Sequence, residues 1–260
     1  MMSGEVAMKI EELRGAYLDL LRDCLTGLIY DDPPLDWSGE GLRAFDRKVR
    51  AGGMDWPARA HSMIGQRRML QLQRAAEFVI DNDIAGDFIE TGAWRGGACI
   101  LMRAVLKVRG VTDRRVWVAD SFRGMPPPNP ERYPVDRGDH LHTIRALAVS
   151  LDAVRDNFAR YGMLDDQVVF LEGWFRDTLP TAPIERLALL RLDGDLYEST
   201  TDALGALYDK VSVGGFVIVD DYGAYPSCRA ATIDFRASRR ITERMYDIDG
   251  SGVFWQRGVA

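Results

Sequence analysis

Four aspartates are the side chains in this sequence best suited to chemistry. Asp193 and Asp195 form a DGD motif after the apolar run LALLRL, and Asp220 and Asp221 end a second apolar run, GGFVIV. If the two runs are adjacent parallel strands, their ends lie side by side, with about 4.8 Å between strands. Carboxylates this close repel one another unless they are protonated or neutralised by a cation. All-oxygen ligands suit a hard ion, so the pattern predicts a divalent cation site of the Mg²⁺ type; singly, each aspartate fits a loop cap.

A glycine-containing turn follows a third apolar run. The segment ETGAWRGG spans residues 90–97. Glycines let a backbone turn sharply and approach a ligand, and the N–H groups of the next helix can meet that ligand. The pattern departs from GxGxxG after Gly92, which disfavours a nicotinamide dinucleotide. Glu90 would repel a pyrophosphate but suits a ligand with a cationic amine. A tight turn that binds nothing remains the alternative.

Asp120 ends the apolar run VWVAD. In a doubly wound sheet, an acid at this position lies within reach of a ribose, whose hydroxyls donate hydrogen bonds to a carboxylate. A turn aspartate would have the same sequence context, because Asp-Ser favours turns. Combined with the glycine-containing turn, Asp120 favours an adenosine-type ligand.

The segment 123–150 is long and rich in proline and charge, so we expect a structureless loop. A loop of this length in a compact domain is either disordered or functional, and its place after a strand end favours function. Two of the three histidines, His140 and His142, lie in it and are candidate substrate contacts. His61 lies outside it, and the three histidines lack metal-ligand spacing. Trp174 follows Glu172-Gly173 at another strand end, where an adenine could stack.

Short apolar runs alternate with segments of helical length from residue 86 onward. The predicted strands are 87–92, 116–121, 168–173, 187–195 and 214–223, the predicted helices are 98–108, 151–161, 199–211 and 228–237, and 242–247 and 252–256 are predicted edge strands. Strands this apolar are typical of a parallel sheet covered on both faces. The sequence therefore predicts one doubly wound α/β domain.

A helical arm precedes this domain. Apolar residues recur at spacings of three and four over the first 30 residues, at Ile10, Leu13, Tyr17, Leu20, Leu21, Cys24, Leu25 and Leu28. The break DDPPLDWSGEG, a short helix over 42–50 and a helix over 62–81 with Ser62 as N-cap follow. The apolar stripe of the first helix needs cover, which predicts a homo-oligomer, although an intramolecular partner would serve as well.

Composition limits the classes of protein. The chain has 260 residues and a formal net charge of −6, which argues against sequence-independent nucleic-acid binding. No apolar run is long enough for a transmembrane helix, and the N-terminal segment lacks the features of a signal peptide. Three cysteines without CxxC spacing indicate free thiols in a reducing compartment. We expect a soluble, cytoplasmic protein that binds neither nucleic acid nor membrane.

Five long motifs together resemble the macrocin O-methyltransferase family, whose members modify sugars of macrolide and aminocoumarin antibiotics. They are DWPARAHSMIG, ETGAWRGGACI, VWVADSFRGMPPP, DDQVVFLEGWFRDTLPTAPIERLALLRLDGDLYEST and GGFVIVDDYGAYPSCR. The likeness covers nearly the whole chain, but residues 1–50 match only loosely. The family commonly has Thr where Ser62 stands here, a conservative change.

The resemblance implies a fold, a cofactor and a reaction. The fold would be that of class I S-adenosylmethionine-dependent methyltransferases, Rossmann-like, with a seven-stranded, mostly parallel sheet. Residues 1–60 would form an N-terminal helical arm and lid, and residues 61–260 the methyltransferase domain, with a lid loop at 123–150. The reaction would be Mg²⁺-dependent methylation of a sugar hydroxyl on a glycosylated natural product, a small-molecule glycoside.

The resemblance also implies roles for individual residues. Asp193, Asp220 and Asp221 would be metal ligands, with Asp193 also the general base and Asp195 a support. Trp56 would lie near the substrate. The residues implied to bind the cofactor are Met63, Glu90, Thr91, Gly92, Trp94, Asp120, Ser121, Phe122, Gly173 and Trp174.

Three alternatives compete with this prediction. A DGD motif after an apolar strand also resembles the metal-binding motif of glycosyltransferases, which holds a sugar nucleotide, but that motif does not predict Asp120 or the Asp220-Asp221 pair. A non-catalytic scaffold that binds the cofactor is disfavoured by the intact set of aspartates. A nicotinamide dehydrogenase lacks the required second glycine.

Overall fold

The computed structural model describes residues 4–36 and 41–258, and its centre is a seven-stranded sheet. The strands are β3 (Asp87–Thr91), β4 (Val116–Asp120), β5 (Val168–Glu172), β6 (Leu187–Leu192), β7 (Val211–Val219), β8 (Tyr246–Asp247) and β9 (Val253–Gln256). Their order is β5-β4-β3-β6-β7-β9-β8. The first five are parallel, whereas β9 pairs antiparallel with β7 and β8. The predicted doubly wound α/β domain and the two predicted edge strands are confirmed, and the structure shows that the edge strands pair antiparallel.

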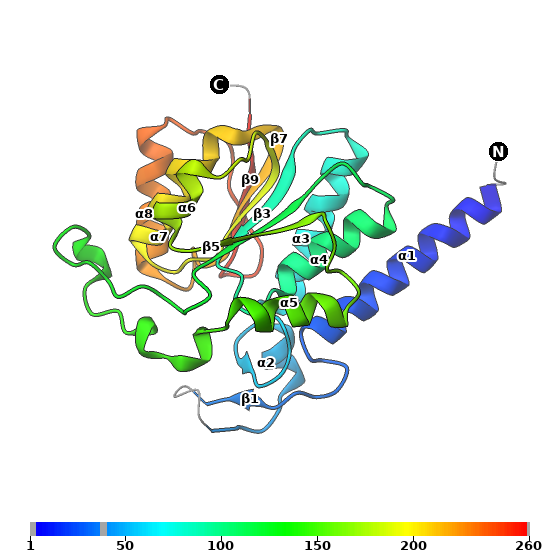
Figure 1. Cartoon of the computed structure of the whole chain (residues 1–260), viewed down its shortest axis with the longest axis horizontal. Helices are drawn as coiled ribbons and strands as arrows, with labels where there is room; N and C mark the ends of the chain where they lie inside the picture. The colour runs from blue at the N-terminus through cyan, green and yellow to red at the C-terminus, as the bar shows by residue number, and fades with distance from the viewer. Residues whose placement is uncertain (1–3, 37–40, 259–260) are drawn as a thin grey trace.

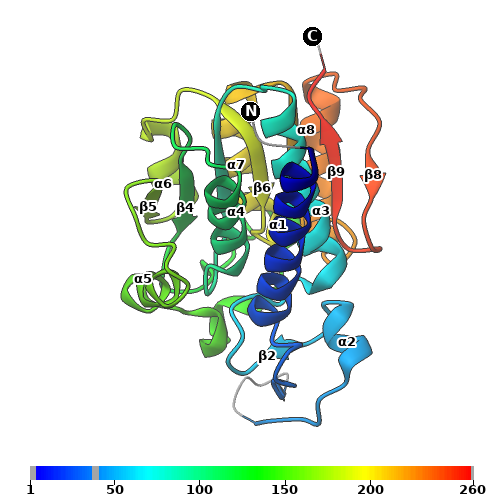
Figure 2. The same ribbon diagram turned by 90° about the vertical axis from the view of Figure 1, so that its right-hand side faces the viewer.

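Helices cover both faces of the sheet (Figures 1 and 2). α3 (Gly65–Asp81), α4 (Gly97–Val108) and α5 (Leu151–Arg160) contribute to one buried cluster, and α7 (Tyr197–Leu207) and α8 (Pro226–Ser238) contribute to the other. Successive residues of one strand enter opposite clusters, as Phe88 and Ile89 do. Side chains alternate between the two faces of a strand, and both faces are covered by apolar clusters. Residues that point to either face are therefore mostly apolar, which explains the continuous apolar runs in the sequence.

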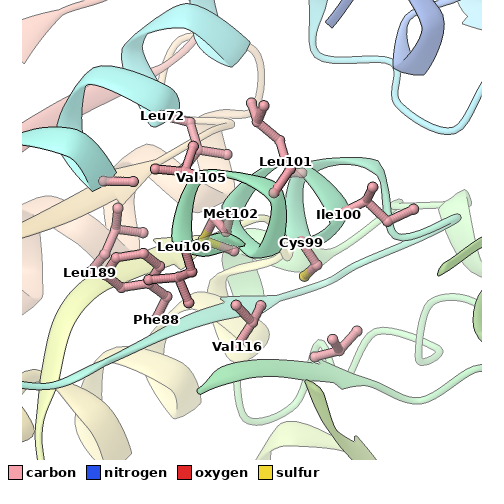
Figure 3. Packing of buried hydrophobic residues seen from close by; sticks show 14 of the residues in the cluster. Leu72, Phe88, Cys99, Ile100, Leu101, Met102, Val105, Leu106, Val116 and Leu189 are labelled. Atoms are coloured by element: carbon pink, nitrogen blue, oxygen red, sulfur yellow. The ribbon is translucent and has the colours of Figure 1, made fainter. Parts of the chain in front are cut away.

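α4 packs both on the sheet and on α3. Its side chains Cys99 and Leu106 point toward the sheet, where Leu106 lies beside Phe88 and Leu189, whereas Leu101 points away from the sheet (Figure 3). Fully burying one such side chain contributes roughly 1.5–3 kcal/mol. Leu106 lies in the last turn of α4, so this contact anchors that end of the helix on the sheet. The first residues of α4, Gly97 and Ala98, lie at the other end of the helix and line the candidate site.

The arm comprises α1 (Gly4–Leu25), β1 (Pro34–Leu35), α2 (Arg47–Ala51) and β2 (Trp56–Pro57). The end of α1 is hydrogen-bonded to the segment that leads into α3. The Leu25 carbonyl accepts from the N–H groups of His61 and Ser62, both at 2.9 Å. The first part of α1 extends away from the rest of the chain (Figure 1). Accordingly, the apolar stripe is divided: Leu21, Leu25 and Leu28 are buried, whereas Leu13, Tyr17 and Leu20 are exposed.

Two predicted helix starts were wrong. α2 begins at Arg47 because Asp46 caps it, accepting from the N–H groups of Lys48 and Val49. α3 begins at Gly65 with Ile64, not Ser62, at the N-cap position. The prediction also missed the antiparallel β1–β2 pair. Residues 1–3 of the predicted arm helix and residues 37–40 of the predicted break lie outside the described residues.

The segment 123–150 is not structureless, which corrects the prediction. It contains three short 3₁₀ helices, η1 (Pro134–Asp136), η2 (Leu141–Thr143) and η3 (Arg145–Leu147). The buried Asp136 carboxylate accepts from the N–H groups of Tyr197 and Glu198, which caps α7. The indole N–H of Trp94 donates to the Ala146 carbonyl at 2.8 Å. The loop is therefore attached to both sides of the candidate site.

The remaining helices are short. α6 (Phe175–Thr178), which the sequence did not predict, leads into the 3₁₀ helix η4 (Leu179–Thr181), and η5 (Tyr208–Lys210) follows α7. No helix within residues 4–36 and 41–258 combines the length and the apolar character needed to cross a membrane.

Candidate active site

A cavity of about 560 Å³ opens at the carboxyl ends of β3, β4, β6 and β7, where ligands bind in open α/β sheets. The arm, the segment 123–150, α6, α7 and the turn between β8 and β9 also contribute to its wall. Most of the side chains predicted for the site line this cavity: Trp56, Met63, Glu90, Gly92, Trp94, Asp120, Ser121, Trp174, Asp193, Asp195, Asp220 and Asp221. One space thus brings together the predicted cofactor and cation residues.

The glycine-containing turn is shaped by the protein itself. Gly92 has φ +92°, and a Cβ there would lie 1.7 Å from the Asp193 carbonyl oxygen, so only glycine fits beside β6. The amides of this turn already have acceptors: Gly92 donates to Ala119 O, Gly96 to Ala93 O and Gly97 to His61 O. Of the N–H groups that begin α4, that of Gly97 is therefore already occupied within the chain and is not free for a ligand.

Asp120 completes this closed arrangement. Its Oδ2 accepts from the N–H groups of Ala93 at 2.8 Å and Trp94 at 3.2 Å, and its Oδ1 accepts from Phe122 N at 2.7 Å. Burial raises the pKa of the Asp120 carboxyl, and these amide donors oppose the increase. Asp120 thus stabilises the turn, which was the alternative to a ribose-binding role in the sequence analysis. It also lines the cavity.

Glu90 lies beneath the turn and is fully buried. Its carboxylate pairs with Arg191, and its Oε2 lies 2.8 Å from Cys99 Sγ. Burial raises the pKa of Glu90 to about 7, although the charge of Arg191 opposes the shift. Glu90 can therefore gain or lose a proton near neutral pH at the edge of the cavity.

The predicted acid cluster is present. Asp193, Asp220 and Asp221 each offer a carboxylate oxygen, and these oxygens lie within 4.8 Å of one another. Burial raises the pKa values of the Asp193 and Asp221 carboxyls, and neighbouring aspartates add to the shift at Asp221. Asp221 Oδ2 is buried without a hydrogen-bond partner. The adjacent parallel strands β6 and β7 bring the cluster together, as the sequence predicts.

Two buried arginines were missed and partly neutralise the cluster. Arg191, in β6, pairs with Glu90, with Asp220 and with Asp193 at 2.7 Å. Arg68, in α3, pairs with Asp220 and with Asp249 at 3.0 Å. The premise that only a cation could keep these acids together is therefore wrong. A signal existed for Arg191, because it is a charge inside the otherwise apolar run LALLRL.

Five predicted residues do not line the cavity. Thr91 is buried with an unpartnered hydroxyl, and Phe122 packs on Phe170 at 6.2 Å between ring centroids. Gly173 donates its N–H to Asp120 O at 2.9 Å. His140 and His142 are exposed on the segment 123–150. These five can act on a ligand only indirectly in this conformation.

His61 also lines the cavity, although no role was predicted for it. Its Nδ1 lies 3.0 Å from the Tyr161 hydroxyl. Burial, together with the charges of Arg95 and Arg160, lowers the pKa of His61 to about 4. His61 is therefore neutral at physiological pH.

Known proteins resemble this chain over nearly its full length. A family model described as Macrocin-O-methyltransferase (TylF) matches residues 37–257. The 8-demethyl-8-(2,3-dimethoxy-alpha-L-rhamnosyl)-tetracenomycin-C 4'-O-methyltransferase of Streptomyces olivaceus is 52% identical over 254 residues, covering 96% of this chain and 95% of that protein. The demethyldecarbamoylnovobiocin O-methyltransferase of Streptomyces niveus is 50% identical over 255 residues, covering 97% of each chain.

A solved structure shows the same likeness as the related sequences. The structure of the O-methyltransferase NovP superposes with a TM-score of 0.91 and 51% identity, covering 95% of this chain and 100% of that chain. The predicted class I S-adenosylmethionine-dependent methyltransferase fold is confirmed. The chain therefore belongs to the macrocin-O-methyltransferase family of S-adenosylmethionine-dependent O-methyltransferases.

Proposed function

We propose that this enzyme methylates a hydroxyl group on the sugar of a glycosylated natural product, in antibiotic tailoring, and that a divalent cation, Mg²⁺, takes part. The observation that carries the proposal is the meeting of Asp193, Asp220 and Asp221 at one wall of the cavity, with their oxygens within 4.8 Å. The names of relatives support the substrate class, since one is a rhamnosyl-tetracenomycin 4'-O-methyltransferase.

The residues present fit a hard cation. Asp193, Asp220 and Asp221 offer only carboxylate oxygens, which suit Mg²⁺ better than Zn²⁺. The unpartnered, buried Asp221 Oδ2 supports this assignment, because a buried carboxylate oxygen without a donor is costly. When bound, the dication would stabilise negative charge developing on the acceptor oxygen.

Asp193 is the candidate general base. A sugar hydroxyl is a weak nucleophile, because its pKa lies far above 7, so a proton must leave as methyl transfer proceeds. Burial raises the pKa of Asp193, which makes its carboxylate a better proton acceptor than a solvated aspartate. Arg191 donates to Asp193 Oδ2 at 2.7 Å, which fixes the carboxylate in orientation.

The cofactor would occupy the wall formed by the glycine-containing turn. S-Adenosylmethionine supplies a methyl group on a sulfonium, whose positive charge is lost on transfer. Glu90 and Trp94 would frame its methionine end, Asp120 its ribose and Trp174 its adenine. The carboxylates of this wall suit a cationic ligand, and a cavity closed by the arm and the 123–150 segment would exclude water.

The charge of the cavity disfavours the sugar-nucleotide alternative. Only Arg68 and Arg176 bring permanent positive charge to the described lining, against ten carboxyl groups. The ten are Asp55, Glu90, Asp120, Asp193, Asp195, Glu198, Asp202, Asp220, Asp221 and Asp249. A diphosphate would be repelled by this excess of acids, whereas a neutral glycoside would not.

Product analysis would test the proposal. The enzyme is incubated with S-adenosylmethionine and Mg²⁺ plus a panel of glycosides, their free aglycones or nucleotide sugars, and products are identified by mass spectrometry. We expect methylation of a glycoside, its loss with EDTA and its recovery with added Mg²⁺. Undiminished turnover in metal-free buffer would refute the cation, and methylation of nucleotide sugars alone would refute the acceptor class.

We also propose that the chain forms a homo-oligomer through α1. Leu13, Tyr17 and Leu20 of this helix are exposed apolar side chains, and they support an intermolecular partner. Light scattering after size-exclusion chromatography would measure the mass in solution. A monomer at micromolar concentration would contradict the proposal.

A further inference from the structure

Asp220 is held from two sides by arginines that come from different parts of the chain. Arg191 precedes the DGD motif in β6 and pairs with Asp220 Oδ1. Arg68 comes from the first turns of α3 and pairs with Asp220 Oδ2. Both guanidinium groups are almost completely buried. Asp220 is thus the acid of the cluster whose two oxygens are both engaged by the protein.

Besides α3, which carries it, Arg68 connects the turn between β8 and β9 and the arm to this acid. Its Nε donates to Asp249 Oδ2 at 3.0 Å, in the turn between β8 and β9. One terminal nitrogen donates to the Gly53 carbonyl at 3.2 Å, in the arm. Gly53 has φ +66°, and a Cβ there would lie 2.6 Å from that nitrogen, so the arm approaches Arg68 as closely as only glycine allows. One side chain therefore joins α3, β7, the β8–β9 turn and the arm.

Arg68 affects a cation at this site in two opposing ways. As a positive charge beside Asp220, it repels a dication and weakens cation binding. As a rigid donor, it fixes the carboxylate beside Asp193 and Asp221 and so prepares the ligand set. The contributions have opposite signs, so the direction in which cation affinity changes on removing Arg68 reveals which is larger.

We propose that Arg68 is a positioning residue of the cation site: it fixes the Asp220 carboxylate for the ion and holds the arm at Gly53 against that site. Loss of a partner that orients a metal ligand typically weakens metal affinity by 10–100-fold. This inference rests on the proposed role of the acid cluster in binding a divalent cation.

Manganese titration followed by electron paramagnetic resonance tests the proposal without turnover, since only free Mn²⁺ gives the strong solution signal. The wild-type chain is compared with Arg68→Gln and with Arg176→Gln. Arg176 also lines the cavity but pairs with Glu198, so its replacement removes the same charge without touching Asp220. We expect Arg68→Gln to weaken Mn²⁺ binding at least about 10-fold, and Arg176→Gln to leave it unchanged or slightly tighter.

A second Arg68 variant and two further measurements distinguish a positioning role from a pure charge effect and from misfolding. Arg68→Lys keeps the charge but not the planar fork that reaches three acceptors, so we expect it also to bind Mn²⁺ more weakly than the wild type. Hydrogen exchange over residues 52–56 should rise in both Arg68 variants. Binding of S-adenosylhomocysteine, measured by calorimetry, should change less than about threefold (well under 1 kcal/mol) if the fold is intact.

The outcomes are distinct. If Arg68→Gln binds Mn²⁺ as tightly as the wild type or more tightly, orientation of Asp220 by Arg68 brings no net gain in affinity, and the positioning role is refuted. Wild-type affinity in Arg68→Lys would show that the planar guanidinium is not needed, which also refutes the role. If the wild-type chain itself binds no Mn²⁺ or Mg²⁺, the cation in the proposed function fails, and this inference fails with it.

Discussion

The two walls of the cavity differ in how their polar groups are satisfied. On the wall of the glycine-containing turn, the Asp120 carboxylate has three backbone donors, and the turn amides have acceptors within the chain. On the wall of the acid cluster, Asp221 Oδ2 has no donor, and Asp220 depends on arginines that are distant in sequence. The Asp120 carboxylate of the first wall is satisfied by backbone amides, whereas the second wall has an excess of acid over base.

This difference indicates how each wall would meet its ligand. A wall whose backbone is already hydrogen-bonded can offer shape and a few charged groups to a cofactor without rearranging. A wall with uncompensated buried carboxylates gains most from a cation. Breaking the first wall should therefore affect folding and cofactor affinity, and breaking the second should affect turnover.

The largest effect is expected from Asp193→Asn. The amide cannot accept the proton of a sugar hydroxyl, so we expect turnover to fall by about 10²–10⁴-fold, the usual contribution of a general base. Release of S-adenosylhomocysteine in the presence of a glycoside acceptor measures the rate. Calorimetry with the same product should show cofactor binding within a few-fold of the wild type. Retained turnover would remove Asp193 from the mechanism.

Gly92→Ala should be the most destabilising change on the first wall. The new Cβ would lie 1.7 Å from the Asp193 carbonyl oxygen, and φ is +92°. We expect a loss of about 3 kcal/mol or more in the free energy of unfolding. Gly110→Ala is the matched control, because φ is +69° but nothing lies within 4 Å. It should cost only about 1 kcal/mol, and equal losses would show that the close approach is unimportant.

Asp120→Asn tests the ligand role of the first wall. The amide keeps one acceptor oxygen but loses the charge, so we expect affinity for S-adenosylhomocysteine to fall about 10–100-fold, as for loss of a charged hydrogen bond. Calorimetry gives the affinity, and thermal unfolding with saturating ligand checks the fold. Affinity equal to that of the wild type would leave Asp120 with its turn role alone.

The smallest effect is expected at His61. Because its pKa in the folded protein is about 4, below the usual 6.5, the folded state resists protonation. Its contribution to stability is complete above about pH 6.5 and is lost as pH falls toward 4, by roughly 1–2 kcal/mol after allowance for partial exposure. Urea unfolding at pH 7 and pH 5 should show a smaller pH dependence for His61→Gln. An unchanged pH dependence would contradict this assignment.

Much of the site could be predicted because it depends on local sequence and on one topological rule. Apolar runs with Asp120, Asp193 and Asp220 at their ends identify parallel strands, and the carboxyl ends of such strands meet at one edge. The division of the chain at residue 60 remains a prediction. The segment 123–150 could not be predicted, because its short 3₁₀ helices are held by Trp94 and by α7, which are distant in sequence.

The sequence by itself determined where the apolar runs of the strands lie, which carboxylates end them and that a glycine-containing turn follows β3, because side-chain alternation and turn sterics act over a few residues. Only the tertiary structure decided which charges become counter-ions. Arg67 and Arg68 are identical neighbours, yet Arg67 is exposed and Arg68 is buried against Asp220. Arg68 lies on the same face of α3 as Leu72 and Val79, so the packing of that face onto the sheet carries it into the site.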